Sequence, residues 1–139
     1  MARILIIDDS PSALSLMDQI LTEGGHTVIS RLTARDAMKL VAQTMVDLIV
    51  TDVYMPDKDG LEVILEAQKA CPNIPVIAIS GAGGMKNMLR DAQLLGAACT
   101  LQKPFAKQQL LDAVATVLAS IAANSSATSP IPPQKEPRA

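Results

Sequence analysis

The sequence predicts an α/β fold: a doubly wound, five-stranded parallel sheet in the order 2-1-3-4-5, with five helices in three layers. Five short apolar runs alternate along the chain with five segments whose apolar residues recur at helical spacing. Each helix can return the chain to the start of the next parallel strand by a right-handed crossover. Three runs are almost wholly apolar and are expected at the centre of the sheet, while the two more polar runs are expected at its edges.

The expected strands and helices follow one another in the order that this fold requires. The expected strands are residues 3–7, 26–30, 48–52, 75–80 and 97–102. The expected helices are residues 11–23, 33–45, 60–70, 85–95 and 106–122. We therefore expect one folded domain, residues 1–122, followed by a disordered Ser/Pro-rich tail, residues 123–139.

Local signals mark where several helices begin and end. Ser10 is placed to cap the first helix, and Pro11 is tolerated at the first helical position. Thr33 and Asp36 resemble a capping box at the start of the second. The apolar residues expected to face the core include Leu14, Met17, Ile20 and Leu21, then Ala37, Met38, Val41, Ala42 and Met45, and then Leu61, Ile64 and Leu65.

Composition narrows the class of protein. The chain has 139 residues, the length of one domain, and a net charge of −2, which does not favour a nucleic-acid surface. No apolar run approaches the ~20 residues needed to cross a bilayer. The first apolar run meets Asp8 and Asp9 too soon for a signal peptide, so we expect a cytoplasmic protein without membrane insertion.

The residues that could bind zinc or form a disulfide are few. The cysteines, Cys71 and Cys99, are expected to be free thiols, because a cytoplasmic protein is kept reduced. With His26 as the single histidine and no closely spaced cysteine pair, a zinc site has no ligand set.

Polar residues stand at the end of four of the five strands. The residues concerned are Asp8 and Asp9 after the first strand, Asp52 at the end of the third, Ser80 at the end of the fourth and Lys103 after the fifth. In a parallel sheet these ends share one edge, and ligands of open α/β sheets bind at that edge. We therefore expect these side chains to form one site.

The charges of this cluster suit a metal ion and a phosphoryl group. Three carboxylates and one ammonium group sum to −2, which one divalent cation would neutralise. Clustered carboxylates are hard oxygen donors of the kind that Mg²⁺ prefers. Asp52 can then act as a carboxylate nucleophile that forms an aspartyl phosphate. The metal and Lys103 would share the charge on the phosphoryl oxygens, to which Ser80 would donate a hydrogen bond.

Four separated motifs resemble those of a known family. They are Asp8-Asp9-Ser10, Asp52 with Met55-Pro56 and Gly60, Ser80-Gly81, and Lys103-Pro104-Phe105. Together they resemble the receiver domain of two-component response regulators, in the single-domain form of the chemotaxis regulators. The resemblance covers residues 1–122 and implies a flavodoxin-like fold, for which the strand order 2-1-3-4-5 is already known.

The resemblance also implies roles for individual residues. Asp52 would receive a phosphoryl group from a histidine kinase or a histidine phosphotransfer protein. Mg²⁺ would be held by Asp9, Asp52 and the backbone carbonyl of Tyr54, with Asp8 assisting. Lys103, Ser80 and backbone amides near Tyr54 and Gly81 would contact the phosphoryl group.

Signalling in the resembled family passes through the surface of the fourth helix, fifth strand and fifth helix. We expect phosphorylation to switch this surface, with Ser80 and Thr100 as the switch positions and with no output domain after the last helix. Thr100 stands where the family commonly has an aromatic residue, so Met85, Met88 and the glycine link, residues 81–84, are alternative responders. A further hypothesis is that the ring of Tyr54 overhangs the phosphoryl site and slows hydrolysis.

Two other functions remain open at this stage. The first is a phosphohydrolase with an aspartate nucleophile, although haloacid-dehalogenase enzymes have their two aspartates one residue apart and Asp8 and Asp9 are adjacent. The second is a flavodoxin-like module that binds a flavin or nucleotide, although Asp8 and Asp9 would repel its phosphate. The favoured hypothesis is a signalling domain that acts on no diffusible substrate. At most, it would phosphorylate and dephosphorylate itself at Asp52.

Overall fold

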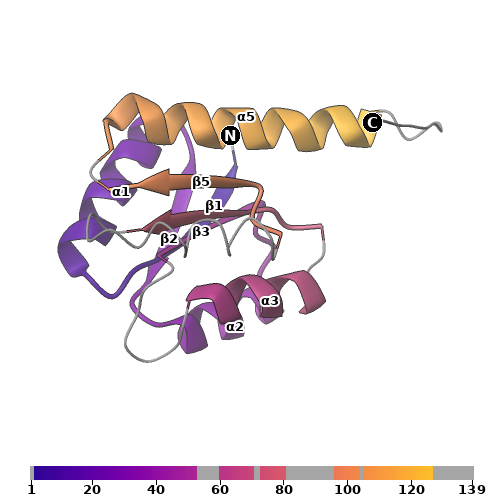
Figure 1. The fold of residues 1–139 in the computed structure, drawn as a ribbon, viewed down its shortest axis with the longest axis horizontal. Helices are drawn as coiled ribbons and strands as arrows, with labels where there is room; N and C mark the ends of the chain where they lie inside the picture. Colours follow the sequence, from indigo (N-terminus) through magenta and orange to yellow (C-terminus); the bar gives the residue numbers. More distant parts are fainter. Residues whose placement is uncertain (1, 53–59, 71–72, 81–95, 104, 127–139) are drawn as a thin grey trace.

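Five strands form one parallel sheet in the order β2-β1-β3-β4-β5 (Figure 1), which confirms the predicted order. The computed structural model describes residues 2–52, 60–70, 73–80, 96–103 and 105–126. The strands are β1 (Arg3–Ile7), β2 (Thr27–Arg31), β3 (Leu48–Asp52), β4 (Val76–Ser80) and β5 (Cys99–Gln102). The described helices are α1 (Pro11–Glu23), α2 (Ala34–Gln43), α3 (Gly60–Ala70) and α5 (Lys107–Ser126). The expected helix 85–95, with Met85 and Met88, lies outside the described residues.

Helices cover both faces of the sheet and make three layers. In Figure 1, α1 and α5 lie on one side of the sheet, and α2 and α3 lie on the other. Successive strand residues point to opposite faces, so each face has its own apolar core. Ile4, Ile6, Leu48, Val50, Ile77 and Ile79 pack with α1 and α5. Leu5, Ile7, Ile49, Val76 and Ala78 pack with α2 and α3.

The central strands are more deeply buried than the edge strands, as predicted. All residues of β3 and β4 are buried, and in β1 only Arg3 is exposed. The edge strands β2 and β5 contain no fully buried residue. The difference arises because a central strand of a doubly wound sheet is covered by helices on both faces and flanked by strands on both sides.

The predicted signals at the start of α1 and α2 are confirmed. The Ser10 hydroxyl accepts a hydrogen bond from the Ala13 N–H at 3.3 Å, and Pro11 begins α1. The Thr33 hydroxyl accepts one from the Asp36 N–H at 3.2 Å at the start of α2. Because α1 begins at Pro11, only residues 8–10 separate it from β1. The first turn of α1 therefore holds the segment 8–10 at the carboxyl edge of the sheet.

Three residues that were expected to face the core are exposed instead, for two reasons. Consecutive residues of a helix point about 100° apart, so Ala42, beside the buried Val41, and Leu65, beside the buried Ile64, are turned outward. Met45 is 81% exposed, because α2 ends at Gln43 and the chain is then extended. Leu61 was also expected to face the core, but its side chain lies outside the described part of the chain.

The last helix ends later than the expected residue 122. Helix α5 continues to Ser126, so residues 123–126 of the expected tail are helical. The run of small residues with high helix propensity, such as Ala122 and Ala123, explains the extension. Residues 127–139, where the tail was expected to be disordered, lie outside the described residues. Strand β5 begins at Cys99, two residues later than expected.

Two leucines of α1 provide a matched test of this core. Leu21 is fully buried between the sheet and α5, whereas Leu16 is 56% exposed. We expect Leu21→Ala to lower the free energy of unfolding by about 2–5 kcal/mol, since it removes apolar contacts and leaves a cavity. We expect Leu16→Ala to change it by less than about 0.5 kcal/mol. Urea unfolding followed by circular dichroism would measure both, and equal effects would contradict the packing described.

Candidate functional site

The polar residues at the strand ends meet at one edge of the sheet, as the sequence predicts. Asp52 is the last residue of β3 and Ser80 is the last residue of β4. Asp8 directly follows β1, and Lys103 directly follows β5. The parallel register aligns β3 with β4 and β4 with β5 at these ends, so the four residues come from adjacent strands of the sheet.

Three carboxylates form the centre of the site. One oxygen each from Asp8, Asp9 and Asp52 lies within 4.8 Å of the other two. The ammonium group of Lys103 lies beside two of them: its Nζ is 2.7 Å from Asp8 Oδ2 and 3.3 Å from Asp52 Oδ2. The ammonium group of Lys103 therefore offsets part of the negative charge at the point where the three carboxylates meet.

The three carboxylates differ in their access to solvent. The Asp8 side chain is 1% exposed and that of Asp52 is 9% exposed, whereas Asp9 lies at the surface. An unpaired buried carboxylate costs several kcal/mol, so the lysine contact is needed to hold Asp8 in place. Asp9 and the small exposed part of the Asp52 side chain form the side of the cluster that faces solvent. A metal ion or a phosphoryl group can approach the cluster from this side.

Backbone hydrogen bonds position Asp8 in a way that the sequence analysis did not foresee. Its Oδ1 accepts a hydrogen bond from the Ser10 N–H at 3.0 Å, and its own N–H donates to the Arg31 carbonyl at 3.3 Å. An aspartate two residues before a serine cap is the pattern of an Asx turn, and that signal could have predicted the first contact. The second depends on the pairing of β1 with β2.

Burial and ion pairing act on Lys103 in opposite directions. Burial by itself lowers the pKa of the Lys103 ammonium, but the hydrogen bond and charge of Asp8, joined by those of Asp52, outweigh it. The pKa of Lys103 is therefore raised above its ordinary value. The backbone fixes the residue as well, since the Lys103 N–H donates to the Ser80 carbonyl at 2.7 Å.

Of the four remaining predicted site residues, the structure describes Ser80 and Thr100. Ser80 is 1% exposed at the end of β4, beside the backbone of Lys103. Thr100 is half-buried in β5 and pairs in register with Ala78 of β4. Tyr54 and Gly81 lie outside the described residues. The structure thus brings Asp8, Asp9, Asp52 and Lys103 into contact range and places Ser80 on the neighbouring strand end.

The donor set fits a hard divalent cation. Its ligand atoms are carboxylate oxygens, which suit such an ion better than a soft one. Asp8, Asp9, Asp52 and Lys103 together carry a charge of −2, in agreement with the sequence analysis. The cluster of aspartates could therefore hold a metal ion.

Comparison with known proteins places the chain in a family. The profile described as the response regulator receiver domain matches residues 4–115. The chain belongs to this family. It is therefore a receiver domain of two-component signalling, and the resemblance drawn from the four motifs is confirmed. Among the described residues, every helix is too short or too polar to span a lipid bilayer.

Relatives of two kinds resemble this receiver domain. The chemotaxis protein CheY of Thermotoga maritima is 30% identical over 113 residues, which cover 81% of this chain and 93% of that protein. The transcriptional regulatory protein GlrR of Escherichia coli (strain K12) is also 30% identical over 113 residues. This match covers 81% of the chain but 25% of GlrR, so the chain spans about a quarter of the length of such regulators.

A solved structure supports the fold assignment. The CheY-like receiver domain protein of Methanospirillum hungatei JF-1 superposes with a TM-score of 0.83 at 27% identity. The superposition covers 89% of this chain and 98% of that protein. The predicted doubly wound, flavodoxin-like fold is therefore confirmed.

The raised pKa of Lys103 predicts a pH dependence of stability. Its proton is held more tightly in the folded state than in the unfolded chain, where a lysine titrates near about 10.4. The stabilisation is therefore complete below that pH and is lost as pH rises through the higher folded pKa. We expect the stability difference between the parent and Lys103→Met to shrink in this range.

Urea unfolding from neutral pH to about pH 11 would measure this difference. Lys39→Met, at an exposed position of α2, serves as the control. If the difference between parent and Lys103→Met has the same pH profile as that between parent and Lys39→Met, the ion pairs of Lys103 do not act as described.

Proposed function

We propose that Asp52 is the phosphoacceptor of this receiver domain. The observation that carries the proposal is that Asp52 lies close to Asp8, Asp9 and Lys103 at the carboxyl edge of the sheet. Asp52 lies on the central strand β3 and contacts Lys103 directly, and 9% of its side chain remains exposed. The phosphoryl donor would be a histidine kinase or a histidine phosphotransfer protein, in keeping with the family.

The reaction is a transfer between two side chains. One Asp52 oxygen forms a bond to phosphorus as the phosphorus–nitrogen bond of the donor phosphohistidine breaks, and the electron pair of that bond returns to the imidazole nitrogen. Lys103 offers its charge to the phosphoryl oxygens, where negative charge must be stabilised. Ser80 stands at the neighbouring strand end, and its hydroxyl would donate a hydrogen bond to the same group.

The metal that fits this reaction is Mg²⁺. Asp9 and Asp52 would hold it, with Asp8 assisting, and when bound it would offset the charge of the phosphoryl oxygens. Lys103 already lies between Asp8 and Asp52, so it keeps the two buried carboxylates partly neutralised in the absence of other cations. The expected contacts from the Tyr54 carbonyl and from amides near Tyr54 and Gly81 fall outside the described residues.

The proposed activity is that of a switch. The chain would accept a phosphoryl group from its partner and at most phosphorylate and dephosphorylate itself at Asp52. Membership of the receiver family supports this function over a phosphohydrolase or a flavin-binding module. The cytoplasmic location stays a prediction.

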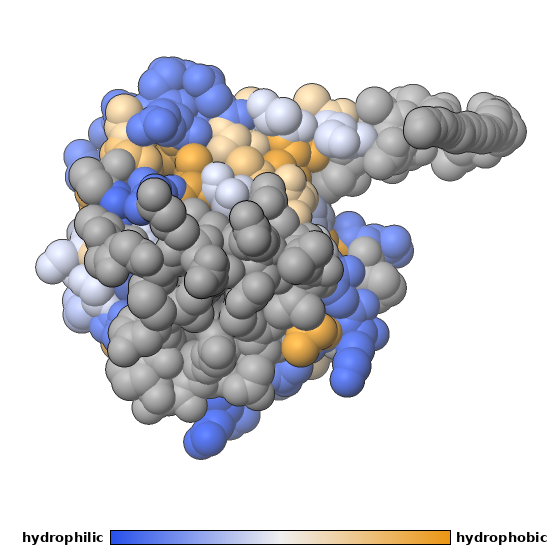
Figure 2. All heavy atoms as spheres, in the orientation of Figure 1, coloured by the Kyte–Doolittle hydropathy of each residue, from blue (hydrophilic) through white to orange (hydrophobic). Residues whose placement is uncertain are grey.

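The surface that would carry the signal includes β5 and α5. In Figure 2, apolar spheres on the viewed face lie mainly over these two elements. Cys99, Leu101 and Phe105 are partly buried there against the core. Thr100 lies in the same strand, and Lys103 directly follows it. A change at Lys103 can therefore reach this surface through β5, which Lys103 directly follows.

Chemical phosphorylation would test the role of Asp52. Incubation with acetyl phosphate and Mg²⁺ should add the mass of one phosphoryl group to the parent, measured on the intact protein. Asp52→Asn should gain nothing, because an amide is not a nucleophile of this kind. Asp47→Asn is the matched control, since Asp47 is exposed just before the other end of β3. Chelation of Mg²⁺ should abolish labelling of the parent, and an adduct on Asp52→Asn would contradict the assignment.

A phosphoryl mimic would test the switch surface. Beryllofluoride with Mg²⁺ should shift amide NMR signals over residues 81–102, including Thr100 of β5, because the surface changes arrangement with the site. Asp52→Asn treated in the same way is the control and should show no such shifts. Shifts confined to Asp8, Asp9 and Asp52 and their neighbours would show that the signal does not leave the pocket.

A further inference from the structure

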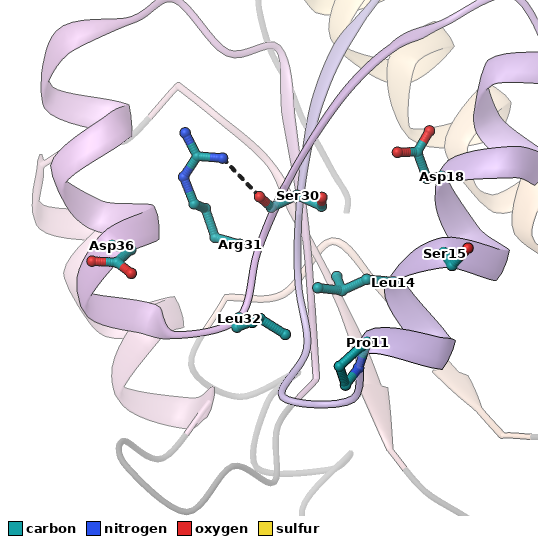
Figure 3. A pocket seen from close by; sticks show the side chains of 8 residues that line it. All are labelled: Pro11, Leu14, Ser15, Asp18, Ser30, Arg31, Leu32 and Asp36. Atoms are coloured by element: carbon teal, nitrogen blue, oxygen red, sulfur yellow. Dashed lines mark hydrogen bonds between the residues drawn. The ribbon is translucent and has the colours of Figure 1, made fainter.

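A groove of about 540 Å³ lies between α1 and the segment that joins β2 to α2 (Figure 3). Pro11 and Leu14 line it from α1, and Arg31 and Leu32 line it from the end of β2 and the turn after it. A volume of this size accommodates several side chains of a bound partner. None of its lining residues belongs to the cluster of Asp8, Asp9, Asp52 and Lys103.

The lower part of the groove is apolar. In Figure 3, the side chains of Leu14 and Leu32 point toward each other from opposite walls, with Pro11 below them. Leu14 is buried in the core, whereas Leu32 is 48% exposed. A single exposed leucine on a surface is ordinary. Here Leu32 extends an apolar surface that a partner could cover.

The walls above this floor are acidic. Asp18 lies on the α1 side and Asp36 on the α2 side. The guanidinium of Arg31 is turned to its own strand, where Nη1 donates to the Ser30 carbonyl at 2.7 Å. Two carboxylates and one guanidinium leave the lining with a charge of −1. Such walls repel phosphates and nucleic acids and attract lysine or arginine.

We propose that this groove binds an amphipathic, basic helix of a partner protein. A leucine-sized side chain of that helix would rest on Leu14 and Leu32, and lysines or arginines beside it would reach Asp18 and Asp36. An apolar anchor flanked by charges at helical spacing is the pattern by which helices bind grooves in other proteins.

The groove is joined to the acidic site through the backbone. The Arg31 carbonyl accepts the hydrogen bond of the Asp8 N–H, and Pro11 follows Ser10, whose N–H donates to the Asp8 carboxylate. A partner in the groove would thus contact the two segments that hold the buried carboxylate in place. Neither Asp9 nor Asp52 lines the groove, so helix binding and phosphorylation can occur on the same molecule.

A designed peptide would test the groove on the full chain. The probe is a dye-labelled helical peptide with leucines on one face and lysines beside them, and binding is measured by fluorescence anisotropy. We expect Leu32→Ser and the double variant Asp18→Asn/Asp36→Asn each to weaken binding about tenfold. The matched controls are Leu65→Ser, at a leucine that is 42% exposed on α3, and Asp112→Asn, at an exposed aspartate on α5. Both controls should bind as the parent does.

Three results would overturn the proposal. Equal losses in Leu32→Ser and Leu65→Ser would mean that the peptide binds exposed leucines without preference. Equal binding of a peptide with glutamates in place of lysines would remove the role of the acidic walls. Self-association of the parent that Leu32→Ser abolishes would assign the groove to a second copy of the chain. Amide NMR shifts of the parent with the peptide should centre on Leu14, Leu32 and Asp36.

Discussion

The contact of Lys103 with Asp8 and Asp52 is the interaction on which the site depends. Three carboxylates within 4.8 Å of one another repel, and two of them are almost fully buried. Without a cation, the folded state would have to bear several kcal/mol for each buried charge. Lys103 supplies that cation from a position 95 residues further along the chain than Asp8. The ion pair thus connects the first and last strand ends across the centre of the sheet.

The geometry of the sheet makes this contact feasible. Because all five strands are parallel, their carboxyl ends meet at one edge, and the order β2-β1-β3-β4-β5 puts β3 at the centre between β1 and β4. The register then decides which residues arrive together, since a slip of one residue would turn Asp52 to the opposite face. Such a slip would also disrupt the close packing of the β3 and β4 side chains against the helices on both faces.

The same edge brings two surfaces close to the acidic cluster. On one side, β5 and α5 adjoin Lys103 in the sequence, and the Lys103 N–H donates a hydrogen bond to the Ser80 carbonyl at the end of β4. On the other, the groove between α1 and the segment that joins β2 to α2 is connected to Asp8 by the Arg31 carbonyl and the Ser10 N–H. The buried ion pair therefore lies between these two parts of the surface.

The sequence by itself determined the order of strands and helices, the caps at Ser10 and Thr33, and the residues that would gather at the sheet edge. The elements and their caps are local features, because they depend on the period of apolar residues and on short polar signals that act within one turn. The meeting of the strand ends follows from the parallel arrangement of the strands. Only the tertiary structure decided that Asp8 is buried and held by Arg31, that Lys103 lies nearer to Asp8 than to Asp52, and that Leu65 and Met45 face outward. These contacts join residues far apart in the chain, and they depend on how strands pair and helices rotate as they pack, which no local pattern specifies.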